Sequence, residues 1–112
     1  MVEDILNEAK INNFLSDIES IFPNFVAGII TDRHGFTIGT KMPPNFHIQE
    51  IKMALYAITN NNNYIQDSRL VKVKRNLDKS RNFKLLLLLE KSNNYMNRFE
   101  KLKNIIENQS LF

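Results

Sequence analysis

The fold of this chain is decided by the stretch Val26–Thr40, which reads VAGIITDRHGFTIGT. The apolar and β-branched run Phe25–Thr31 predicts a buried strand. The segment Asp32–Gly35 indicates a tight turn, because Asp caps backbone N–H groups and Gly supplies a positive φ. Strand character resumes over Phe36–Thr40, so the two runs together predict a β-hairpin.

Helical periodicity flanks this hairpin. Apolar residues at spacings of three and four predict one helix over residues 2–21, ended by Pro23, and a second over residues 46–60. Ser92 can cap a third helix with an apolar stripe. The stripe of the first helix is Ile11, Phe14, Leu15, Ile18 and Phe22, and that of the third is Tyr95, Phe99, Leu102 and Ile106.

Two more strands are expected in the second half of the chain. Arg69–Arg75 alternates, with Val71 and Val73 on one face and its lysines on the other. Phe83–Glu90 is apolar almost throughout, which is typical of a central strand covered on both faces. A weak fifth strand over Tyr64–Ser68 remains open. We therefore expect a single α+β domain over residues 1–112, with an antiparallel sheet of four to five strands flanked by helices, in the order α-β-β-α-β-β-(β)-α.

The second helix has apolar residues on more than one side, which indicates burial on more than one side. One side is expected to face the sheet of its own chain and the other a second chain. The stripe assigned to the chain's own sheet is Ile48, Ile51, Leu55 and Ile58. The residues that lie away from it are Met53, Tyr56 and Ala57.

Composition excludes several kinds of chemistry. Without Cys there is no disulfide framework, thiolate metal site or cysteine nucleophile, and the presence of only two His residues argues against a His-rich metal centre. No phosphate-binding glycine motif is present, and Asp32 and His34 are interpreted as turn residues. We therefore expect no enzyme activity, no cofactor and no metal. The acidic N-terminus has no long apolar run, so we expect a soluble, cytoplasmic protein.

A net charge of +3 conceals an uneven distribution. Residues 1–50 hold three Lys or Arg against seven Asp or Glu, and residues 51–112 hold twelve against five. Most of the excess lies between Arg69 and Lys84. That segment has no aromatic residue before Phe83, which argues against a nucleic-acid groove. Other interpretations remain. The lysines can protect a sheet edge from unwanted pairing, or they can contact an acidic partner or an anionic membrane surface.

The hairpin resembles that of the roadblock (dynein light chain) family. That family has a helix, an apolar strand with an early Gly, a turn of the form Asp-x-x-Gly and a second strand; Gly28, Asp32 and Gly35 stand at those positions. The helix after the hairpin and the strand and helix over Phe83–Glu107 are also similar, so the resemblance spans nearly the whole chain. The family usually has three strands between its second and third helices, whereas two are clear here.

The resemblance implies a function. Roadblock proteins dimerise through the second helix and an edge strand, and the pair binds small Ras-like GTPases or acts as a scaffold. The interface positions carried over to this chain are Met53, Tyr56, Ala57, Asn60, Leu70, Val71, Lys72, Val73 and Lys74. We therefore expect a non-catalytic adaptor that pairs with itself or a related subunit, binds such a GTPase, and meets membranes at most through partners.

Three alternatives stay open. The first is a GTPase-activating regulator, since Arg33 lies at an exposed turn. The second is a nucleic-acid-binding module built on the basic strand. The third is a profilin-like or longin-like module, because those folds also place helices around an antiparallel sheet.

Overall fold

The computed structural model describes residues 8–92 and 98–112. Its elements follow the order α1 (Glu8–Ile21), β1 (Phe25–Asp32), β2 (Thr37–Lys41), α2 (Glu50–Ile58), η2 (Asn62–Tyr64), β3 (Leu70–Asn76), β4 (Phe83–Glu90) and α3 (Arg98–Asn108). The expected α+β class and the order α-β-β-α-β-β-α are confirmed. The expected N-terminal part of the first helix and Tyr95 of the third lie outside the described residues.

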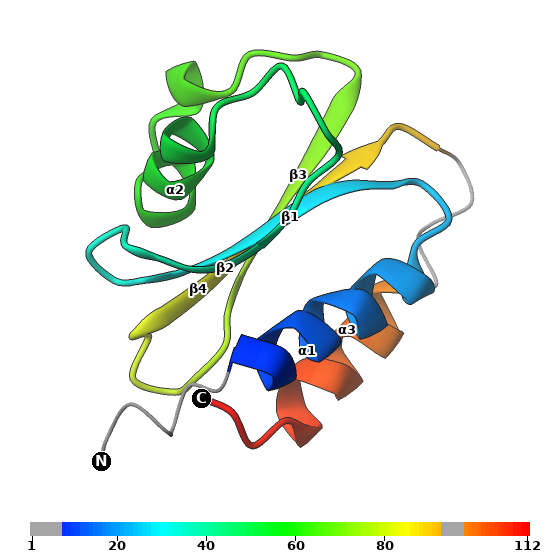
Figure 1. Cartoon of the computed structure of the whole chain (residues 1–112), viewed down its shortest axis with the longest axis vertical. Coiled ribbons are helices and arrows are strands. Elements are labelled where there is room, and N and C mark those ends of the chain that lie inside the picture. Colours follow the sequence, from blue (N-terminus) through cyan, green and yellow to red (C-terminus); the bar gives the residue numbers. More distant parts are fainter. Residues whose placement is uncertain (1–7, 93–97) are drawn as a thin grey trace.

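The four strands form one antiparallel sheet in the order β2-β1-β4-β3. Helix α2 covers one face, and α1 and α3 cover the other (Figure 1). The central position of β4 explains its composition, because Leu85 to Leu89 are all fully buried. Odd-numbered leucines of β4 face α1 and α3, and even-numbered ones face α2.

The hairpin turn forms as its chemistry predicts. The Asp32 carboxylate accepts hydrogen bonds from the backbone N–H groups of His34 (2.8 Å) and Phe36 (3.0 Å). Gly35 has a φ of 92°, which an L side chain rarely adopts. Gly28 is buried in β1 between the side chains of Phe25 and Leu87. These residues shape the hairpin, so the structure assigns them a structural role.

Tyr64–Ser68 holds no fifth strand. Asn62–Tyr64 is a 3₁₀ turn, capped by the Asn61 side chain, which accepts a hydrogen bond from the Asn63 N–H. The remaining residues lead into β3 without pairing to it. Consequently β3 is an edge strand, as expected for the strand that carries Lys72 and Lys74.

Candidate interaction surface

The outer edge of β3 presents unpaired backbone groups. The Arg69 carbonyl accepts from the Lys91 N–H and the Leu77 N–H donates to the Phe83 carbonyl, so odd-numbered residues of this strand bond to β4. In an antiparallel ladder the alternate residues point the other way. The backbone groups of Leu70, Lys72, Lys74 and Asn76 therefore point outward.

Some of these outward groups are already satisfied. The Leu70 N–H donates to the Asp67 carbonyl at 3.1 Å, and the Arg75 guanidinium donates to the Lys74 carbonyl at 2.8 Å. In the described part of the chain no other strand pairs with this edge. The N–H and C=O of Lys72 thus remain open at the centre of β3, which is the arrangement that accepts an added strand.

The side chain of Lys74, on β3, bonds to the C-terminal end of α2. Its ammonium donates to the carbonyls of Tyr56 (3.1 Å) and Thr59 at the C-terminal end of α2, and lies 4.8 Å from the centre of the Tyr56 ring. A cation here complements the helix dipole. Burial, and then the nearby Lys84, lowers the pKa of Lys74 below its usual value. The Lys74 side chain therefore fixes α2 on the sheet.

Lys72 makes fewer contacts with α2 than Lys74 does. Its ammonium lies 6.0 Å from the centre of the Tyr56 ring, on the same face of the sheet. Lys84 reaches this face too, where its ammonium bonds to the Asn76 side chain at 2.6 Å. Among the described residues, no carboxylate lies within 4.0 Å of the ammonium of Lys72, Lys74 or Lys84. This part of the edge carries uncompensated positive charge.

The two sides of α2 differ from the sequence-based expectation, although Ile48, just before the helix, packs on the chain's own sheet as expected. Met53, Tyr56 and Ala57 pack on the chain's own sheet and are 0%, 9% and 6% exposed. Ile51, which was assigned to the sheet, is instead 61% exposed. The prediction that Met53 and Ala57 meet a second chain is corrected on this ground, because neither has surface to offer.

Tyr56 and Asn60 differ from those two residues. The Tyr56 ring lies beneath the ammonium groups of the β3 edge, and its hydroxyl donates to the Asn62 side chain at 3.3 Å. The Tyr56 ring therefore packs against the lysines of the β3 edge. Asn60 follows the C-terminal end of α2 and is exposed.

A second exposed surface is apolar. Leu55 and Ile58 are partly exposed and share the outer side of α2 with Ile51. The backbone of Gly35 lies against Ile58, which brings the hairpin turn to the end of this helix. Phe36, the next residue of the turn, is 70% exposed. The hairpin turn and the end of α2 at Ile58 therefore lie side by side, and both the turn and the helix expose apolar side chains.

The loop before β3 is fixed by Asp67. Its carboxylate accepts from the Arg69 side chain (3.1 and 3.0 Å) and the Arg69 N–H (3.0 Å), and it contacts His47 Nε2 at 2.8 Å. Arg69, and to a lesser extent His47, holds the pKa of Asp67 well below its usual range. The contact to His47 ties the entrance of β3 to the loop that precedes α2.

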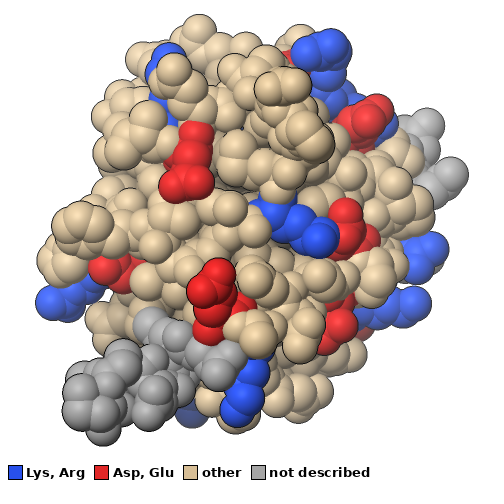
Figure 2. Space-filling view, viewed as in Figure 1, with Lys and Arg blue, Asp and Glu red and all other residues tan. Residues whose placement is uncertain are grey.

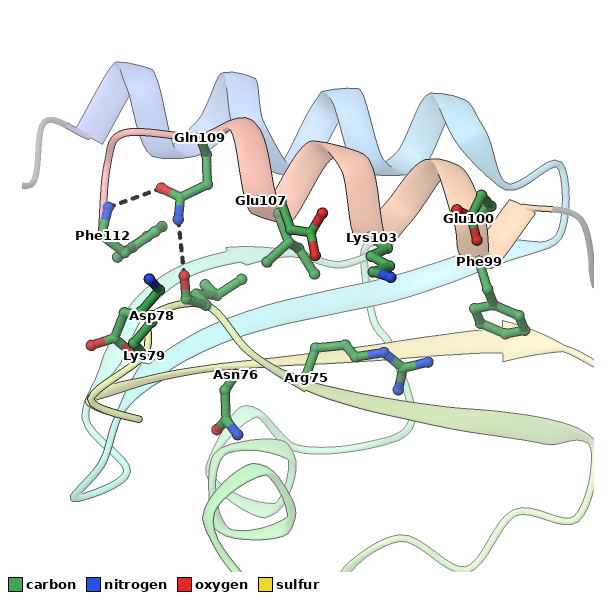
Figure 3. A pocket seen from close by; sticks show the side chains of 12 residues that line it. Arg75, Asn76, Asp78, Lys79, Phe99, Glu100, Lys103, Glu107, Gln109 and Phe112 are labelled. Atoms are coloured by element: carbon green, nitrogen blue, oxygen red, sulfur yellow. Dashed lines mark hydrogen bonds between the residues drawn. The ribbon is translucent and has the colours of Figure 1, made fainter.

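A groove runs between β3 and α3, on the opposite face of the sheet from α2 (Figure 3). Its apolar lining comes from Leu77, Phe99, Ile106 and Phe112. Arg75 extends from β3 toward Phe99, with its guanidinium carbon 5.7 Å from the ring centre. The sequence did not indicate this groove, because the stripe expected for the third helix includes Phe99 and Ile106 but does not say where that helix packs.

Charge is mixed on one face of the molecule. The face seen in Figure 2 shows acidic and basic side chains scattered among neutral ones, without a continuous basic patch. The basic segment itself is divided, because Lys72 and Lys74 lie on the α2 face and Arg75 on the α3 face. This division does not produce the aromatic-lined basic groove that single-stranded nucleic acids prefer.

Residues 8–92 and 98–112 contain neither a metal centre nor a membrane-spanning helix. No three His, Asp or Glu side chains come together there in a way that would hold a metal ion. No helix in that part of the chain has the length and apolar character to span a membrane.

Comparison with models of known protein families finds no match, and comparisons with curated proteins and with solved structures find none either. The resemblance to the roadblock family therefore rests on the hairpin residues and the order of elements, and it stays a hypothesis.

Proposed function

We propose that this chain is a non-catalytic cytoplasmic adaptor that joins another chain along the outer edge of β3, and that the resulting pair binds or regulates a small Ras-like GTPase. The observation that carries the pairing is the open backbone at Lys72 on an edge strand. Strand addition supplies backbone hydrogen bonds for affinity and side-chain contacts for specificity.

The GTPase part of the proposal is supported by the resemblance of Val26–Thr40 to the roadblock hairpin. An adaptor needs a second contact surface, and the exposed apolar side chains of α2 (Ile51) and of the hairpin turn (Phe36) are available for it. Exposed apolar patches of this kind commonly mark sites of protein contact.

A proline at position 72 tests the pairing. Because the Lys72 N–H points away from β4, Lys72→Pro removes no hydrogen bond within the sheet but blocks strand addition. Lys72→Gln is the matched control, since it keeps the N–H and removes only the charge. Each tagged variant is used to isolate partners from the source cells, and its fold is checked by circular dichroism.

The proposal expects a partner that wild type and Lys72→Gln retain and that folded Lys72→Pro loses. Retention of every partner by folded Lys72→Pro would contradict pairing along β3. If a GTPase is among the partners, its rate of GTP hydrolysis with and without this protein separates an adaptor from an activating regulator.

A further inference from the structure

The side chains along β3 disfavour pairing with a second copy of the chain. The outward backbone groups belong to even-numbered residues, so a symmetric antiparallel pair brings even positions opposite one another. In the three central registers Lys72 or Lys74 then lies opposite Lys72 or Lys74 of the other copy. Like charges directly opposite each other destabilise a sheet. Repulsion between these lysines therefore disfavours pairing of β3 with β3 of a second copy.

The same face favours carboxylates. Lys72, Lys74 and Lys84 all lie on the α2 side, and no carboxylate of the described residues lies within ion-pair distance of them. Lys74 already bonds to the end of α2, which leaves Lys72 as the cation best placed for an incoming strand. Residues of that strand that point to the α2 side would thus be acidic.

The opposite face sets a different requirement. Residues of an added strand that point to the α3 side would lie over the groove lined by Phe99, Ile106 and Phe112 (Figure 3). The charges at this groove have both signs, with Arg75 and Lys103 near Glu100 and Glu107. The groove therefore has no preference of sign, and its lining suits apolar side chains.

We propose that the partner of β3 is an extended segment of another protein in which acidic residues alternate with apolar ones. Its backbone bonds to the outward groups of β3, its acidic side chains face Lys72, and its apolar side chains enter the groove beside α3. This inference rests on the proposed pairing along β3 and names the chemistry of the partner strand.

The test uses synthetic peptides. A fluorescent eight-residue peptide in which Glu alternates with Val is titrated with the whole protein, and binding is followed by fluorescence anisotropy. The same peptide with Lys in place of Glu, and a 20-nucleotide oligo-dT strand, are the competing probes. Variants are Lys72→Glu, Lys72→Pro and the control Lys101→Glu, which makes the same charge change on α3 outside the groove.

We expect the Glu peptide to bind at least about tenfold more tightly than the Lys peptide, because complementary charge across an interface selects partners. Lys72→Glu should weaken binding about tenfold and Lys72→Pro should abolish it, while Lys101→Glu leaves it unchanged. Added salt should weaken binding of the Glu peptide, since these charges are exposed to solvent.

The negative outcomes separate the two proposals. Equal binding of both peptides, an unchanged affinity in Lys72→Glu, or preferred binding of oligo-dT would overturn the acidic strand. A wild-type dimer by light scattering that folded Lys72→Pro converts to a monomer would also overturn it, because a second copy would then occupy the edge, yet pairing along β3 would stand. Binding of the Glu peptide that survives Lys72→Pro would contradict pairing along β3 itself.

Discussion

Replacing Lys74 by Met should destabilise the fold, because it removes the cation that joins β3 to the end of α2. The Lys74 ammonium donates to two backbone carbonyls, those of Tyr56 and Thr59, and lies 4.8 Å from the Tyr56 ring centre. Met keeps the length and apolar stem of Lys, so the change isolates the charge and its hydrogen bonds.

The magnitude follows from these contacts. A cation at a helix C-terminus contributes about 0.3–1 kcal/mol at the surface and up to about 2 kcal/mol when partly buried. A cation over an aromatic ring adds about 0.5–1 kcal/mol. Burial and the nearby Lys84 oppose both contributions and lower the pKa of Lys74, whereas the two carbonyls that accept from its ammonium lose their partner when it is removed. We expect a net loss of about 1–1.5 kcal/mol in the free energy of unfolding.

Urea unfolding followed by circular dichroism measures this loss as a lower midpoint with an unchanged slope. Lys72→Met is the matched control, because its ammonium lies 6.0 Å from the same ring and makes no hydrogen bond to α2. The control should change stability by less than about 0.5 kcal/mol. Equal stability of Lys74→Met and wild type, or an equal loss in both variants, would refute the claim that Lys74 joins β3 to α2 and Lys72 does not.

Two further perturbations test other parts of the structure. Arg69 and His47 hold the pKa of Asp67 low, so the Asp67 carboxylate takes up a proton at a lower pH in the folded state than in the unfolded state. The contribution of Asp67 to the free energy of unfolding is therefore fully present above about pH 4 and is lost as the pH falls below that value. Asp67→Asn should therefore melt at a lower temperature than wild type at pH 7, with the gap narrowing as the pH falls below about 4, and a gap independent of pH would count against this. Met53→Asp should unfold the protein or cost more than about 3 kcal/mol, whereas Ile51→Asp should change stability by less than about 0.5 kcal/mol, as measured by urea unfolding; similar losses in both would contradict the observed orientation of α2.

The sequence predicts well those elements whose conformation is decided locally. Asp32 and Gly35 make their turn through contacts a few residues apart, so residue type alone indicates the hairpin. The unbroken leucines of β4 likewise require cover on both faces. The edge position of β3 was predictable from its lysines, because charged side chains are common on strands without a neighbour.

The orientation of α2 could not be read from periodicity. This short helix has apolar residues around most of its circumference, so either side could have faced the sheet. Ala54 and Ala57 offer the physical reason for the side that does, since small residues let a helix backbone approach a sheet closely. The two alanines are three residues apart and so lie on one side of the helix, which could have indicated the side that packs on the sheet. The larger residues Ile51, Leu55 and Ile58 pointed instead to the other side.

The groove beside α3 depends on tertiary structure in a similar way. Phe99 and Phe112 come together with β3 only because α3 and the residues after it pack on the same face of the sheet, next to the end of β3. Nothing in the local pattern near Arg75 indicates that Phe99 lies next to it. The strand could be predicted as an interaction site, but the surface on its second side could not.

Amide hydrogen exchange resolved by residue tests the central claim most directly. In the free protein the outward N–H of Lys72 should exchange quickly, while those of Val71 and Val73, bonded to β4, are protected. Binding of the Glu peptide should slow exchange at Lys72 and Lys74 and leave the two valines unchanged. A Lys72 amide that is already protected in the free protein, or that exchanges as fast in the complex as without it, would contradict docking along β3.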